Sequence, residues 1–436
     1  MLLSTLKAPP LWLRLVVVHP SPALLVPVIA MLLALPAAPA DDLPSLTLEE
    51  ALRLASEQSP QMAAQRSAIT AAEQAAASAR QLPDPKGIVG VDNLPVTGPD
   101  AWSLTSDFMT MRKIGVMQDF PGAGKRELRG KLAERVTAKE QAMLVDVQAA
   151  LRRDVASAWV DRYFAQRMGA VVDQQMAEVQ LQIDAMRAGL KTGKTQPTDL
   201  LAVQLSQQAL LDKRAEFDKQ AARAKAMLSR WLGAAAGRPL APFRLPVGPS
   251  EEGTLADHIA HHPHVQALER QIDVAQSEAA LAKAATNPDW SLEFAYQQRG
   301  PTFSNMISLQ VSIDLPLFQK NRQNRDYAAK LALIEQARDL REEAVRQHLA
   351  EAQAASADWD AATSRLKRFD ESLLPLSQQR ADAALAAYRG GRGDLTPVLQ
   401  ARRDELDIKL QQLQLTADQA RAYAQLLYFL PPEAVK

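Results

Sequence analysis

The sequence contains one long pattern twice, and the second copy follows the first at an offset of about 200 residues. The corresponding segments are Ser59-Pro60 with His262-Pro263, Asp119-Phe120-Pro121 with Asp314-Leu315-Pro316, and Gly193 with Gly391. A repeat of this length indicates two copies of a large structural unit rather than a solenoid of short ones. We assign residues 41–245 to the first copy and 246–436 to the second.

Each copy contains a very long predicted helix. From Gly124 to Leu190 there is no proline, and apolar residues recur at helical spacing, so a helix over 124–190 would span on the order of 100 Å. The second copy predicts a matching helix over 319–389, with a kink at Pro375. Return helices follow over 196–233 and 394–430. The aromatic content of 5% also favours long helices over one globular core.

A shorter helix opens each copy, and two strands separate it from the long one. Leu46 to Arg80 has helical periodicity, and Thr47 followed by Glu50 is typical of a capping box. Trp290 then begins an alternation of apolar and polar residues, which a second run repeats from Ile307. The four predicted strands cover about 86–93, 108–120, 290–298 and 305–316.

The alternating strands leave two environments open. A tilted membrane-spanning strand needs about 9–11 residues with one apolar and one polar face, and the two runs of the second copy meet that requirement. The first copy is weaker, because Ile88 to Asn93 is short and interrupted by glycine. A half-buried hairpin in a soluble sheet shows the same alternation. Four strands cannot close a barrel, and an unpaired sheet edge in lipid is costly, so membrane strands would require several chains to share one barrel.

The N-terminal segment 1–40 has the pattern of a cleaved secretory signal. Lys7 and Arg14 precede an apolar run, and Ala38-Pro39-Ala40 provides small residues at a cleavage site. The chain contains no cysteine, so we expect neither disulfides nor lipidation of a mature N-terminal cysteine. Basic and acidic residues number 50 each, which gives no argument for nucleic-acid binding.

The strand pairs, the long helical hairpins, the export signal and the duplication together resemble the TolC family of outer-membrane efflux channels. The segments Leu82-Pro83-Asp84-Pro85, Asn93-Leu94-Pro95 and Gly115-Val116-Met117-Gln118-Asp119-Phe120-Pro121 are similar to the CzcC/CusC-like branch that exports heavy-metal cations. The resemblance implies a mainly α fold with a small β part: a homotrimer with a 12-strand barrel in outer-membrane lipid and an α-helical periplasmic tunnel. It also implies a periplasmic membrane-fusion adaptor and an inner-membrane RND pump as partners, with no enzymatic activity and no cofactor.

The family resemblance places the closed end and the adaptor contacts at the hairpin tips. Glycine allows the tight reversal, and exposed polar groups are available to a partner, although the same residues also cap helices. The candidate tip residues are Gly193, Lys194, Thr195, Thr198 and Asp199 in the first copy, and Gly391, Arg392, Gly393, Asp394 and Thr396 in the second.

Two groups of residues are candidate metal ligands. His258, His261, His262 and His264 are close enough in sequence for ligation, although the correspondence with Ser59-Pro60 favours an ordinary helix boundary. Strand parity places Met117, and with a longer strand Met111 and Met109, on the polar side. Thioether sulfur suits Cu(I) and Ag(I), whereas methionine is also a flexible apolar filler.

Other functions remain as alternatives. Gly122-Ala123-Gly124-Lys125-Arg126 lacks the first glycine and the final Ser or Thr of a phosphate-binding loop. No pair or triad of catalytic residues stands out. A multidrug or type I secretion duct would have the same fold, and a soluble periplasmic coiled-coil protein would have the helices without a barrel.

Overall fold

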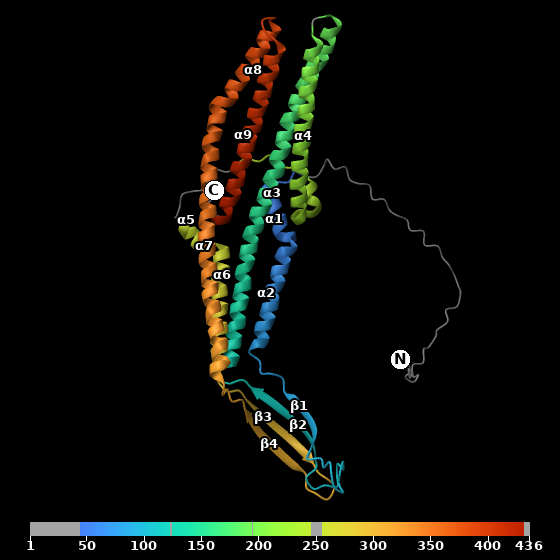
Figure 1. The fold of residues 1–436 in the computed structure, drawn as a ribbon, viewed down its shortest axis with the longest axis vertical. Coiled ribbons are helices and arrows are strands. Elements are labelled where there is room, and N and C mark those ends of the chain that lie inside the picture. The colour runs from blue at the N-terminus through green and yellow to red at the C-terminus, as the bar shows by residue number, and fades with distance from the viewer. Residues whose placement is uncertain (1–43, 123, 194, 246–254, 431–436) are drawn as a thin grey trace, which may run out of the picture. The chain divides into compact units, whose positions relative to one another are not determined.

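The computed structural model describes residues 44–122, 124–193, 195–245 and 255–430, so the predicted signal segment lies outside the described residues. Two helical hairpins run side by side. A four-stranded sheet lies at the end of the helices opposite to the hairpin turns (Figure 1).

The two copies have the same order of elements. The first contains α1 (Leu48–Gln58), α2 (Pro60–Ala79), β1 (Lys86–Asp92), β2 (Met111–Phe120), α3 (Lys125–Lys191) and α4 (Pro197–Leu232), followed by a 3-10 turn over Gly233–Gly237. The second contains α5 (Leu255–Ala260), α6 (Pro263–Ala284), β3 (Trp290–Gln298), β4 (Met306–Ile313), a 3-10 turn over Gln319–Asn321, α7 (Gln323–Arg368), α8 (Leu374–Arg389) and α9 (Leu395–Phe429).

The predicted opening helix is divided in two, so the expectation of one helix from Leu46 to Arg80 was wrong. Ser59 has extended backbone angles and separates α1 from α2. The reason is Pro60, whose ring disfavours helical angles at the preceding residue. Thr47 is confirmed as the N-cap, because its hydroxyl accepts a hydrogen bond of 3.1 Å from the Glu50 amide. The Glu50 carboxylate does not complete the capping box.

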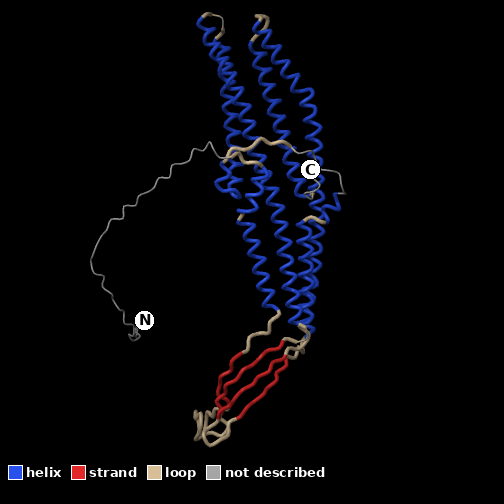
Figure 2. Tube along the Cα trace, turned by 180° about the vertical axis from the view of Figure 1, so that it is seen from behind, coloured by secondary structure: helices blue, strands red, loops and turns tan. Residues whose placement is uncertain are grey.

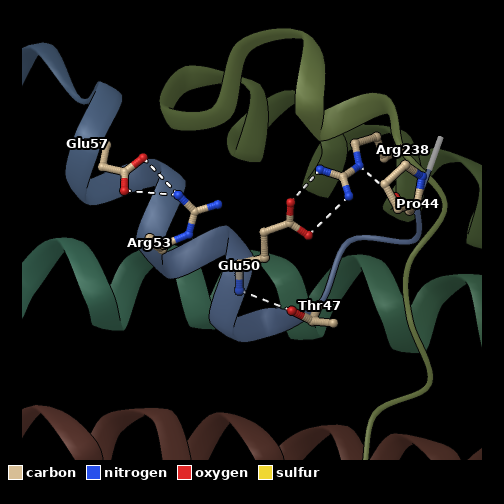
Figure 3. Close-up of polar contacts among 6 residues, drawn as sticks. All are labelled: Pro44, Thr47, Glu50, Arg53, Glu57 and Arg238. Atoms are coloured by element: carbon tan, nitrogen blue, oxygen red, sulfur yellow. Dashed lines mark hydrogen bonds and ion pairs between the residues drawn. The ribbon is translucent and has the colours of Figure 1, made fainter.

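Glu50 instead joins the beginning of the first copy to its end (Figure 3). Its two carboxylate oxygens accept hydrogen bonds of 2.8 and 3.1 Å from Arg238, which also donates to the Pro44 carbonyl. The hydrogen bond to Arg238 lowers the pKa of Glu50. Buried Arg162 of α3 donates to the carbonyls of Ala236 and Arg238. The two ends of the first copy are therefore held together by charged hydrogen bonds.

The helices form a layer in which α9 packs against both α3 and the α7–α8 segment. Helix α4 packs on α3 and has little contact with α9, so α4 and the α7–α8 segment are the two edges of the layer. Buried apolar side chains run along α3 and its neighbours, which spreads the core along the helices. Its large members include Val155, Trp159, Phe164, Val172, Ile183, Val203, Leu228 and Leu406.

The long helix of the second copy is interrupted close to the predicted kink. A π-helical turn over Phe369–Leu373 separates α7 from α8, and Pro375 lies in the first turn of α8. Proline cannot donate the hydrogen bond that a continuous helix requires, and a widened turn before it accommodates the missing bond. The prediction of one helix from 319 also differs from the structure, in which α7 begins at Gln323.

The strands form one antiparallel sheet in the order β1-β2-β3-β4. Figure 2 shows this sheet in red at the end of the helices. Strand β2 begins at Met111 rather than at residue 108, because the Asp107 carboxylate accepts the amides of Met109 and Thr110 and holds them in a turn. Strand β4 ends at Ile313, before the predicted limit of 316. Neither β1 nor β4 has a second partner strand within the described residues, so both are open edges.

Candidate functional site

One face of the sheet is apolar and exposed. The register aligns Val89, Ile114, Tyr296 and Ile307 across the four strands, followed by a neighbouring row through Val116, Phe294 and Leu309. Val89 is 84% exposed and Leu309 is 69% exposed. Apolar exposure over every strand of a sheet is what a lipid-facing surface requires.

The opposite face of the sheet is polar. Lys113 and Glu293 form an ion pair across β2 and β3, and Lys86 pairs with Asp119 at 2.6 Å near the helical end. Strand β4 contributes hydroxyl and amide groups to this face. The strand residues on the polar face are Lys86, Asp92, Met111, Lys113, Met117, Asp119, Ser291, Glu293, Gln297, Met306, Ser308, Gln310 and Ser312, with the apolar Ile88 and the small residues Gly90, Gly115 and Ala295 between them.

The register separates the three candidate methionines. Met111 and Met117 lie on the polar face, at positions opposite Asp92 and Lys86 in β1. Met109 lies before β2 and is 49% exposed, because the Asp107 carboxylate holds it in a turn and the strand begins only at Met111. Met306 also lies on the polar face, opposite Gln297. The sequence analysis missed Met306, although the alternation from Ile307 already places it beside Ser308.

Both hairpin tips reverse through a glycine with positive φ. Gly193 has φ 71° and Gly391 has φ 68°, values that a β-branched residue adopts only with strain. The amide of Gly193 donates to the Leu190 carbonyl, and that of Gly391 donates to Tyr388. Figure 1 shows both turns at the same end of the helices. The paired glycines therefore produce equivalent reversals in the two copies.

The polar candidates at the tips have different exposures. Thr198 is exposed in the first turn of α4, whereas Thr195 and Asp199 are half-buried. Asp394 is the exposed N-cap residue of α9, without a side-chain capping hydrogen bond. Arg392, Gly393 and Thr396 are also exposed. Lys194 lies outside the described residues.

The histidines of the second copy form a buried junction between helices. His262 is 2% exposed and caps α6: its Nδ1 accepts the His264 amide at 3.2 Å, and its Nε2 lies 3.0 Å from the Tyr428 carbonyl of α9. The ring of His348, from α7, lies 4.7 Å from that of His262 between centroids. The Nδ1 of His264 lies 2.9 Å from a carboxylate oxygen of Asp146 on α3. His348 was not among the sequence candidates, because only packing brings it to the other two.

Burial and charge shift these histidines in opposite directions. Burial, with the neighbouring His348, lowers the pKa of His262 to about 4. Burial also lowers the pKa of His348, whereas the hydrogen bond to Asp146 raises that of His264. In its neutral tautomer His262 donates from Nε2 and accepts at Nδ1. Protonation would remove the acceptor that caps α6.

This geometry does not support the histidine metal site. Within the described ranges, no group of three or more His, Cys, Asp or Glu residues is arranged to hold a metal ion. Both ring nitrogens of His262 are occupied by backbone groups, and Nδ1 of His261 is bonded to the Asp257 carbonyl. His258 lies on the short helix α5, whereas His264 is directed to Asp146. The cluster has the contacts of a helix cap and a packing junction.

None of the helices in the described parts of the chain is both long and apolar enough to cross a membrane.

Comparison with known proteins identifies relatives of both sequence and fold. Residues 255–430 match the family described as outer membrane efflux protein. The cobalt-zinc-cadmium resistance protein CzcC of Cupriavidus metallidurans is 24% identical over 297 residues, which cover 66% of this chain and 70% of that protein.

Two solved structures extend the likeness over most of the chain. The CmeC outer membrane channel of Campylobacter jejuni superposes with a TM-score of 0.77 at 10% identity, covering 88% of this chain and 85% of that one. A structure of CusC gives a TM-score of 0.72 at 15% identity, covering 87% and 90%. The exposed apolar sheet face, the paired helical hairpins and the match over the second copy agree with one another. The second copy matches the outer membrane efflux protein family and the chain has the fold of outer membrane channels, and these likenesses indicate an outer-membrane efflux channel protein rather than an enzyme.

Proposed function

We propose that three copies of this chain form one outer-membrane conduit, which serves as the outlet of a tripartite RND-type system exporting heavy-metal cations. A periplasmic adaptor would contact the hairpin tips and an inner-membrane pump would supply the driving force. The conduit itself is passive, and cargo passes according to width, charge and gating at the constriction.

The observation that carries this proposal is the open, two-faced sheet. Its apolar face is exposed on all four strands, while β1 and β4 have no partner strand at their outer edges among the residues that the structure describes. In lipid such edges cost several kcal/mol for each unsatisfied group, so the edges must pair with other strands. Three copies supply the 12 strands that the family resemblance implies, with the apolar face outward and the polar face inward.

The helical layer has open edges of the same kind. Leu201 and Leu205 of α4 are 62% and 72% exposed, and Leu376 on α8 is 62% exposed. Because α4 and the α7–α8 segment are the opposite edges of one layer, α4 of one copy can pack on α8 of the next. A contact between two different surfaces closes into a ring when the rotation allows it. Both edges therefore favour assembly into a closed wall.

The metal cargo is supported by the relationship to the cobalt-zinc-cadmium resistance protein. The decisive experiment uses a strain in which this channel is the only outlet, and it measures tolerance to cobalt, zinc, cadmium, copper and silver with and without the gene. We expect loss of the gene to reduce tolerance to one set of these cations at least fourfold. Unchanged metal tolerance with reduced tolerance to drugs, or with loss of a secreted protein, would assign the alternative cargo.

Assembly is tested independently of cargo. Native mass measurement in mild detergent should give a trimer extracted from the outer-membrane fraction. A monomer that is released without detergent would instead support a soluble coiled-coil protein.

The methionines give a narrower test of copper and silver export. Met111, Met117 and Met306 are replaced together by leucine, which keeps apolar bulk but removes the sulfur. We expect lower tolerance to copper or silver with unchanged tolerance to zinc and cobalt. Met109→Leu is the matched control, because Met109 lies outside the strand. Unchanged copper and silver tolerance at normal protein levels would remove the thioether proposal.

A further inference from the structure

The ion pair between Lys113 and Glu293 crosses the middle of the polar face diagonally. Lys113 on β2 is opposite Gln297, whereas Glu293 on β3 is opposite Met117. The pair therefore passes over the Gly115–Ala295 position, which lies between those two rows. An ion pair between directly opposed residues would need no such crossing. The Lys113–Glu293 pair can form only if the side chains of the row between the two residues are small.

Gly115 has no side chain, and this leaves room for the Lys113–Glu293 ion pair to pass over it. A Cβ atom built at residue 115 would lie 2.7 Å from the Ala295 Cβ and 2.6 Å from the Phe294 carbonyl oxygen, closer than real Cβ contacts. Ala295 is 0% exposed although it belongs to a single sheet. Two small residues of the polar face, Gly115 and Ala295, therefore lie beneath the ion pair.

The crossing pair is more enclosed than the other ion pair on the face. The side chains of Lys113 and Glu293 are 17% and 14% exposed, compared with 59% and 32% for Lys86 and Asp119. An enclosed pair is less screened by salt and less available to a passing ion than an exposed one. Glu293 is thus a carboxylate in mid-sheet whose charge is compensated by its own chain.

We infer that Lys113 is a specificity-determining residue of the conduit, because it neutralises Glu293 and keeps a free carboxylate out of the middle of the lumen. This inference rests on the proposed function, in which the polar face lines the conduit. Three copies would place three compensated pairs at one level. A conduit requires weak sites that release the ion, and three free carboxylates at that level would attract and retain divalent cations. Lys113 therefore permits cations to pass without being held.

The test measures ion selectivity of the purified full-length trimer in planar lipid bilayers under a salt gradient. Lys113→Met leaves Glu293 uncompensated, and we expect the cation-over-anion permeability ratio to rise at least twofold. Glu293→Gln leaves Lys113 uncompensated and should lower the ratio by a similar factor. Cadmium added on the barrel side should reduce the current through Lys113→Met at concentrations at least threefold lower than for the wild type.

Two controls separate charge from structure. Lys113→Arg keeps the positive charge at position 113. The double variant Lys113→Glu with Glu293→Lys keeps an ion pair but exchanges the positions of its two charges. Both should retain the wild-type permeability ratio. Native mass measurement establishes that each variant is assembled, and the two single variants with opposite expected signs test the inference separately.

A conducting wild-type trimer whose permeability ratio is the same in Lys113→Met and Glu293→Gln would overturn this inference alone. The pair would then be only a cross-strand tie. A wild-type protein that is monomeric and gives no conductance would overturn the proposed function, and this inference with it.

Discussion

The two long helices of the chain occupy equivalent places, yet only one of them is continuous. Helix α3 runs unbroken for 67 residues, whereas its counterpart is divided by the π-helical turn into α7 and α8. Pro375 lies as far before Gly391 as Ala177 lies before Gly193. The difference shows that this architecture tolerates a break in one long helix, and Pro375 lies directly after that break.

The largest expected effect comes from placing the break in the continuous helix. Ala177 is exposed on α3, so Ala177→Pro changes little except the backbone. Loss of one hydrogen bond and a clash with the preceding turn should destabilise the protein by about 3 kcal/mol. The measurement is the free energy of unfolding from denaturant titration, with Ala177→Ser as control. An Ala177→Pro variant as stable as the wild type would show that α3 also accommodates a break.

The second difference between the copies is chemical. Ser59 and His262 occupy the same position before a proline, and both are 2% exposed. Ser59 makes no capping hydrogen bond, whereas His262 caps α6. We therefore expect the pH dependence of this particular helix junction to be present in the second copy and absent from the first.

The sign of this pH dependence follows from the lowered pKa values. An unfolded histidine with a pKa near 6.5 binds protons more readily than folded His262 or His348, so stability is complete above that value and falls between about pH 6.5 and 4. The loss from His262 should be about 3 kcal/mol. His264 opposes it, because its raised pKa gives a contribution that is present at low pH and lost as the pH rises.

The groups that face the cluster come from four helices. They are His262 and His264 of the α6 N-terminus, His348 and Glu351 of α7, Asp146 and Arg153 of α3, and Tyr428 of α9. His262→Ser converts the second copy to the residue of the first. We expect its unfolding free energy to vary less between pH 7 and 4.5 than that of the wild type. An equal pH slope in both proteins would place the sensitivity elsewhere.

The hairpin tips test how far the copies are alike. Gly193→Val and Gly391→Val should each cost about 1–2 kcal/mol, because both glycines have positive φ and open space around a Cβ atom. Trimer assembly should persist, while adaptor docking, measured by co-purification, should weaken in both variants. Lost assembly with intact docking would place the partner contact elsewhere. Gly98→Val in the loop between β1 and β2 is a control, because Gly98 also has a positive φ, of 90°, at the other end of the helices.

The smallest effect is expected from removing the break in the second copy. Pro375→Ala restores a backbone donor, and the π-helical turn can then relax toward α-helical geometry. Stability should change by less than about 1 kcal/mol. Backbone amide hydrogen exchange over residues 369–377 should slow relative to the wild type. Unchanged exchange would mean that buried Phe369, rather than Pro375, maintains the turn.

Long-range periodicity made the helices and strand faces predictable, whereas single side chains determined the details that were missed. The Asp107 side chain stabilises a turn before β2, and this turn excludes Met109 from the predicted strand. Glu50 matches a capping box in sequence, but the distant Arg238 binds its carboxylate. The histidine junction requires His348, which lies 84 positions after His264 and has no local signal. Pairing between distant elements is not contained in a local pattern.

The sequential order of the sheet has a consequence for how such a wall could have originated. The β2–β3 ladder joins the two copies of the repeat through nine aligned residue pairs. Such a ladder could equally form between strands of two separate chains. The same kind of ladder can join β4 to β1 of a neighbour. In the proposed trimer, the covalent link between the copies would be incidental to the wall, and the six hairpins would have a pseudo-sixfold arrangement. An ancestral half-length chain could have built it from six separate subunits before the duplication allowed the two halves to diverge.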